Sequence, residues 1–208
     1  MTETTDPSTK RRHRSEADLL HVMTIKGFAT SESIASAIGL QHDVVSELLT
    51  LLLDKGLVSR REKPVPGWGL SPEGREQNRR DLEALRTPAL TSALDLVYDR
   101  FLRINRKIKD LCTRWQESSG RDAAERWKLV EELADIHRGV ERTLRDAAQI
   151  VPGFDRYAIR LANAIAAIDA GDDRYFTHPL VDSYHTVWFE CHQDFLVTLG
   201  RERTDEDA

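Results

Sequence analysis

The sequence predicts a mainly α-helical protein with a β-hairpin in its N-terminal part and an antiparallel bundle of about four helices in its C-terminal part. Three observations lead to this prediction. Apolar residues between positions 15 and 56 recur at helical spacing in three short segments. A hairpin pattern rich in Gly and Pro follows at residues 57–70. The apolar positions between Leu90 and Trp115 then alternate in steps of four and three, which indicates a long helix with a 3.5-residue repeat.

Three short helices are expected before the hairpin. The first spans residues 15–27, since Ser15 can cap it and Gly27 can end it. The second spans residues 30–39 and the third ends at Gly56, each closed by a glycine. The side chains expected to face their common core are Leu19, Leu20, Val22, Met23, Ile34, Ala35, Ile38, Val44, Val45, Leu48, Leu49 and Leu52.

The hairpin is expected to have strands at residues 57–60 and 68–70, joined by a turn that contains Pro64 and Pro66. A further helix should start directly after it. Ser71 is suited to cap that helix, and Pro72 then occupies the first helical position, where a missing N–H is tolerated. The pattern therefore encloses the hairpin between two helices.

Four helices are expected in the C-terminal part. The long helix should be broken at Gly120, the second helix should end before Pro152, and the third should span residues 157–170. The last should open at Pro179 and run to about Leu199. The second helix has its apolar series at Trp127, Val130, Leu133, His137, Val140, Leu144 and Ala147.

Composition and charge favour a soluble globular protein. The 208 residues are 40% hydrophobic and 31% charged, and no apolar run approaches the ~20 residues of a membrane span. The N-terminus also lacks the apolar segment of a secretory signal, so we expect a cytoplasmic protein. Cys112 and Cys191 are too few for a disulfide framework and are expected to be reduced.

The charge is unevenly distributed. Residues 1–86 contain 13 Lys/Arg and 13 Asp/Glu, so the remaining residues hold the whole net charge of −5. We expect a disordered basic arm at residues 1–14, a first domain at 15–86, a helical domain at 87–200 and an acidic tail at 201–208. Local basic clusters, rather than the domain average, would face a polyanion. These clusters are Lys10, Arg11, Arg12 and Arg14, and then Arg60, Arg61 and Lys63.

A specific order of residues runs from position 40 to position 74. An apolar residue is followed five positions later by a valine, then by a leucine, Gly-Leu-Val, a basic segment and an aromatic-x-Leu-Ser-x-x-Gly return. In this chain the parts are Leu40, Val45, Leu52, residues 56–58, residues 60–63 and residues 68–74. Over residues 15–80 the chain resembles the MarR-like winged helix-turn-helix transcriptional regulators. The resemblance implies three helices with a β-hairpin wing, and binding to double-stranded DNA.

The resemblance places the DNA-binding residues on the third helix and on the wing. Asp43 and Glu47 depart from the family pattern, because acids on the exposed face of the third helix repel phosphates. The wing and the arm should therefore supply most of the phosphate contacts, while the third helix could read base edges. The expected DNA-binding residues are Arg11, Arg12, Arg14, Gln41, His42, Ser46, Arg60, Arg61 and Lys63. The alternative is that residues 60–63 only keep a hairpin edge charged against strand pairing.

The last helix is apolar on more than one side, which is typical of a core helix that also faces a second subunit. The more specific hypothesis is an effector site formed by His137, Tyr184, His185 and Trp188. No metal site is expected: His185 and His192 are seven residues apart, or roughly 10 Å along a helix, and cannot share one ion. No cofactor or catalytic motif is evident, so an enzyme is not expected.

The predicted function is that of a ligand-responsive DNA-binding transcriptional regulator. A homodimer on a palindromic site is expected, because one small recognition helix covers few base pairs and a two-fold partner doubles the contacts. The alternative is a winged-helix interaction module or scaffold without DNA binding, which Asp43, Glu47 and the negative net charge motivate.

Overall fold

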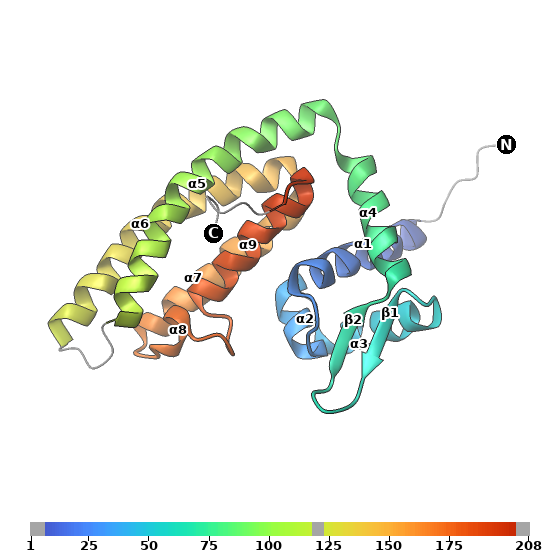
Figure 1. Ribbon diagram of the computed structural model, residues 1–208, viewed down its shortest axis with the longest axis horizontal. Coiled ribbons are helices and arrows are strands. Elements are labelled where there is room, and N and C mark those ends of the chain that lie inside the picture. Colours follow the sequence, from blue (N-terminus) through green and yellow to red (C-terminus); the bar gives the residue numbers. More distant parts are fainter. Residues whose placement is uncertain (1–6, 118–122, 203–208) are drawn as a thin grey trace. The chain divides into compact units, whose positions relative to one another are not determined.

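The computed structural model describes residues 7–117 and 123–202, and the side chains from residue 15 onward within these ranges. The chain is mainly helical and divides after Leu85 into two compact units, each with its own hydrophobic core (Figure 1). No helix in the described ranges combines the length and the apolar character needed to cross a membrane.

The N-terminal unit has three helices followed by a two-stranded antiparallel hairpin and a fourth helix. Its core joins side chains from the first three helices with Val58 and Leu70 of the hairpin. The elements are α1 (Pro7–Lys26), α2 (Ser31–Ile38), α3 (His42–Asp54), β1 (Val58–Arg61), β2 (Gly67–Leu70) and α4 (Pro72–Leu85).

The first helix begins earlier than the sequence analysis expects. It starts at Pro7 rather than at Ser15, so the expectation of a disordered arm is wrong for residues 7–14. Proline is favourable at the first helical position, and the following residues up to Arg14 include no Gly and no further Pro. Residues 1–6 and the side chains of Arg11, Arg12 and Arg14 lie outside the described part of the chain.

The hairpin is joined to the connection between α1 and α2. Its register pairs Val58 with Leu70 and Arg61 with Gly67. Ala29 adds an isolated bridge to Trp68 on the other side of β2, with N···O distances of 3.0 and 2.8 Å. These two backbone hydrogen bonds fix β2 between β1 and the segment before α2.

The start of α4 is packed tightly against the start of the hairpin. The Ser71 hydroxyl accepts from Gly74 N–H at 3.0 Å and donates to the Gly56 carbonyl at 2.7 Å, and Ser71 N–H donates to Leu57 O at 3.1 Å. Gly74 makes this approach possible. A Cβ at this position would overlap the Leu57 carbonyl oxygen and lie 2.9 Å from its carbon.

Within its described residues, the C-terminal unit has four long helices and two short ones. Helix α5 packs against α6 and α9, and α7 packs against α6 and α9, so the long helices share one hydrophobic core (Figure 1). Arg86 donates to the carbonyls of Val197 and Thr198 at the end of α9. The elements are α5 (Pro88–Glu117), α6 (Ala123–Ile150), η1 (Pro152–Phe154), α7 (Asp155–Asp169), α8 (Arg174–Thr177) and α9 (Tyr184–Leu199).

Two expectations for this unit are wrong. The last helix begins at Tyr184 rather than at Pro179, because the Ser183 hydroxyl caps it by accepting from Thr186 N–H at 3.2 Å. Trp127, which the sequence places in the apolar series of the second helix, is 65% exposed. It lies in the second turn of α6, where it faces solvent while Leu129 and Val130 are buried. The expected break at Gly120 lies outside the described residues.

Gly74→Ala tests the contact between α4 and the hairpin. The added methyl group must displace backbone at Leu57, so we expect the free energy of unfolding of the N-terminal unit to fall by about 3 kcal/mol. Urea denaturation of the full chain measures this change. The exposed neighbour Glu73→Ala is the control and should lose less than about 1 kcal/mol. Equal losses in the two variants would show that the close approach does not matter.

Candidate functional site

The start of α3 presents polar side chains to solvent. Gln41 lies at the N-cap position, where its side chain forms no capping hydrogen bond, and Asp43 and Glu47 are exposed. His42 is partly engaged, because its Nε2 lies 3.0 Å from the Ser31 hydroxyl and 3.4 Å from a Glu32 carboxylate oxygen. Gln41 is therefore the predicted base-reading side chain of α3 that is best placed to reach a ligand.

Ser46 is less available than the sequence analysis expects. It is half-buried, and its hydroxyl donates to the His42 carbonyl one turn earlier at 2.9 Å. Thr50 makes the same kind of bond to the Ser46 carbonyl, also at 2.9 Å. A hydroxyl bonded in this way can still accept a hydrogen bond, but its donor is already used.

The two wing arginines are held against aromatic rings. The Arg61 guanidinium carbon lies 3.9 Å from the centre of the Phe28 ring, and that of Arg60 lies 5.5 Å from the centre of the Trp68 ring. Gly67 makes room for Phe28, since a Cβ on Gly67 would come within 2.6 Å of that ring. Such cation–π contacts restrict the arginine side chains while leaving their charge exposed.

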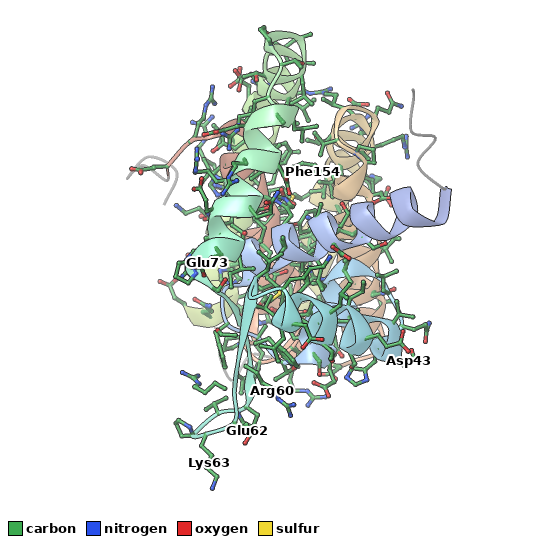
Figure 2. The ribbon with its side chains drawn as sticks, turned by 90° about the vertical axis from the view of Figure 1, so that its right-hand side faces the viewer. Asp43, Arg60, Glu62, Lys63, Glu73 and Phe154 are labelled. Carbon is green, nitrogen blue, oxygen red and sulfur yellow. The ribbon has the colours of Figure 1, made fainter. Side chains whose placement is uncertain are left out.

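Lys63 lies in the turn beyond the two arginines. Figure 2 shows Arg60, Glu62 and Lys63 along the hairpin, with Lys63 reaching furthest from the helices of this unit. Arg61 Nε donates to the Val65 carbonyl at 3.3 Å, which links the two sides of the turn. The hairpin therefore carries three cations and one carboxylate on exposed side chains.

Two acids, Asp43 and Glu47, lie on the exposed face of α3. Asp43 Oδ1 accepts from the Val44 N–H at 3.0 Å, so this carboxylate is tied to the first turn of its own helix. Asp43 and Glu47 are solvent-exposed, so salt would weaken their repulsion of an anion over about 8–10 Å.

The predicted effector residues are partly brought together in the C-terminal unit. His137 Nδ1 lies within hydrogen-bond distance of the Tyr184 hydroxyl, at 3.2 Å, and both side chains are buried. Trp188 is directed toward α5, where its Nε1 donates to Asn105 Oδ1 at 2.8 Å. His185 is half-buried on α9. His137, Tyr184 and Trp188 thus already have partners within the protein.

Buried charges on α7 and α9 were missed by the sequence analysis. Asp194 is 1% exposed and accepts from the Arg156 guanidinium, from Tyr157 OH at 2.8 Å and from Thr198 Oγ1 at 2.9 Å. Burial raises the pKa of Tyr157, which keeps its hydroxyl protonated as a donor. The sequence feature that could have indicated this buried network is the carboxylate of Asp194, which interrupts the apolar residues of α9.

A second buried arginine lies one turn along α7. Arg160 forms two hydrogen bonds to Asp182, at 2.9 and 3.1 Å, and a third to Glu190 at 2.6 Å. Arg160, Asp182 and Glu190 therefore bond to one another. We interpret them as residues that stabilise the fold rather than as a ligand site. Burial also raises the pKa of Cys112 to about 12, so that this thiol is unreactive. The described residues contain no group of three side chains arranged to hold a metal ion.

Asp194→Ala tests the buried network. The change leaves the Arg156 guanidinium and the Tyr157 hydroxyl without their acceptor, and we expect the unfolding free energy of the C-terminal unit to fall by about 3–5 kcal/mol. Asp172→Ala removes an exposed pair with Arg174 and should lower the unfolding free energy far less. Thermal and urea denaturation compare the two variants. A small loss for Asp194→Ala would contradict the structural role.

The pKa of His137 is lowered by burial, with Glu141 acting in the opposite direction, and burial also lowers the pKa of His185. Because the folded state disfavours the charged imidazole, stability should be complete above the unfolded pKa of about 6.5 and fall as the pH decreases below it. Urea midpoints at pH 7.5 and 5.5 measure this loss. His137→Gln, which cannot titrate, should show a smaller loss, and an equal loss would remove His137 from the explanation.

Comparison with known proteins identifies no relative of this chain. No protein-family model, curated protein or solved structure matches the chain.

Proposed function

We propose that the protein is a DNA-binding transcriptional regulator of the MarR-like winged helix-turn-helix class. The observation that carries the proposal is the pair of wing arginines, stacked on Trp68 and Phe28, in a unit whose third helix exposes its first turn. Aromatic contacts restrict both guanidinium groups before a ligand arrives, which lowers the entropic cost of placing them against phosphates. This arrangement supports DNA binding better than a hairpin edge that is charged only to prevent strand pairing.

The two parts of the surface would have different tasks. Arg60, Arg61 and Lys63 would contact phosphates or the minor groove, together with Arg11, Arg12 and Arg14 of α1. Gln41, with lesser contributions from His42 and Ser46, would read base edges at the start of α3. Exposed acids are compatible with this task, since a carboxylate can accept from the amino group of cytosine.

The C-terminal unit would supply a homodimer contact and the response to a ligand. Several large apolar side chains of this unit are exposed, on different elements, and a second subunit would bury those that gather on one face. They are Leu96, Trp127, Ile159 and Leu180, each at least 63% exposed. A ligand at His137, Tyr184, His185 and Trp188 would have to replace the hydrogen bond between His137 and Tyr184.

Neutralising the wing tests DNA binding. We expect the full chain to bind duplex DNA from upstream of its own gene, with two chains per palindromic site and affinity that falls steeply as salt rises. The double variant R60Q/R61Q should bind more weakly. Its plot of log affinity against log salt should be shallower by about 2, one for each lost phosphate contact. Fluorescence anisotropy between low and physiological salt measures both quantities.

Arg79 and Arg80 provide a matched control in the same unit. Both pair with glutamates of α4, so R79Q/R80Q removes the same charge from a helix outside the proposed surface and should leave the slope unchanged. Equal slopes for the wing variant and this control would refute the assignment of the wing. If the wild-type chain binds no genomic DNA at low salt, the alternative of a winged-helix scaffold without DNA binding is favoured.

A further inference from the structure

A hollow of about 600 Å³ lies between α5 and α6 in the C-terminal unit. Four of its eight lining residues are arginines. Ile104 and Gly139 are neighbours in the lining, and we call them its floor. We call it the arginine groove. Its lining residues are Arg100, Arg103, Ile104, Gly139, Arg142, Thr143, Arg145 and Asp146.

The arginines of the groove come as two matched pairs. Arg100 and Arg103 are three residues apart on α5, and Arg142 and Arg145 are three residues apart on α6. Residues at this spacing lie on the same face of a helix, so each helix directs two guanidinium groups to the groove. The heptad repeat describes only the apolar residues of each helix. It does not indicate that these two pairs of arginines lie next to each other.

Positive charge in the groove is only partly neutralised. Asp146 is the only carboxylate among the lining residues, and it forms an ion pair with Arg100 at 2.8 Å. Arg103, Arg142 and Arg145 form no ion pair with any residue of the described ranges. The four arginines are exposed to solvent, so an anion in the hollow would be attracted by several positive charges at once.

Gly139 is a second and independent observation. Glycine inside a helix is about 1 kcal/mol less favourable than alanine. Packing does not require it here, because an added Cβ would meet only the end of Ile104, at an ordinary distance of 3.7 Å. The missing side chain instead keeps the floor of the groove open between the four arginines.

We propose that the arginine groove binds a small polyanion that carries at least two phosphate groups. The guanidinium group presents a planar fork of donors that matches phosphate oxygens, and several such forks favour a ligand with several phosphates. The volume is that of a small-molecule site, and the apolar floor at Ile104 suits a compact ligand better than a duplex. This binding site is separate from the proposed DNA surface and does not depend on it.

Isothermal titration calorimetry of the full chain with phosphate, pyrophosphate and tripolyphosphate tests the proposal. Affinity should increase along this series. The variant R103Q/R142Q should bind tripolyphosphate at least about tenfold more weakly, a change of about 1.4 kcal/mol. Gly139→Leu keeps every charge but fills the floor, and should lose a similar factor. Far-UV circular dichroism and thermal unfolding check that both variants are folded.

The control K107Q/K128Q removes two charges from exposed positions of the same helices outside the groove, and should change the affinity less than about twofold. Equal weakening by the control would indicate diffuse charge attraction and overturn the proposal. So would absence of tripolyphosphate binding by the wild type at about 1 mM. Binding of a duplex of about 20 base pairs that depends on Arg103 and Arg142, without tripolyphosphate binding, would assign the groove to nucleic acid instead.

Discussion

The N-terminal unit depends on the close approach of α4 to the carbonyl oxygen of Leu57. Leu57 precedes β1, and its carbonyl accepts from Ser71 N–H directly after β2. The hairpin is therefore closed at its base by a hydrogen bond, by the Ser71 cap and by a glycine without a side chain at position 74. Because the base is closed, the direction of both strands is fixed. The positions of Arg60 and Arg61 follow from that direction.

In the same unit, a glycine makes space for an aromatic ring that contacts an exposed arginine. Gly67 leaves space for Phe28 beside the hairpin, and Phe28 then supports the Arg61 guanidinium. The bridge from Ala29 to Trp68 holds the segment that carries Phe28 against β2. The placement of the wing arginines thus follows from backbone hydrogen bonds and ring contacts, and neither arginine forms an ion pair within the part of the chain that the structure describes.

Much of the fold could be predicted from local patterns. The glycines that end α2 and α9 have φ of 75° and 72°, and the helical periods predict α3 and α5 to within a few residues. Local patterns were insufficient where tertiary contacts decide. They did not predict that Ser183 rather than Pro179 begins α9, or that Asp194 finds an arginine in the core. A carboxylate in an apolar series gives no sign of which helix carries its partner.

The candidate sites were predictable to different degrees for the same reason. Arg60, Arg61 and Lys63 form one run in the sequence, so a single segment reveals the wing. The four arginines of the groove come from two segments about forty residues apart, and each pair alone resembles an ordinary solvated face.

The arginines of the wing and of the groove also differ in the contacts that hold them. Arg60 and Arg61 rest on rings, whereas Arg103, Arg142 and Arg145 have no charged partner among the described residues. The wing arginines are held in place before a ligand binds. This suits the phosphate backbone of a DNA duplex, which is regular along its whole length. Guanidinium groups that come from two helices and line one hollow suit a small ligand, because they can contact its phosphates from both sides.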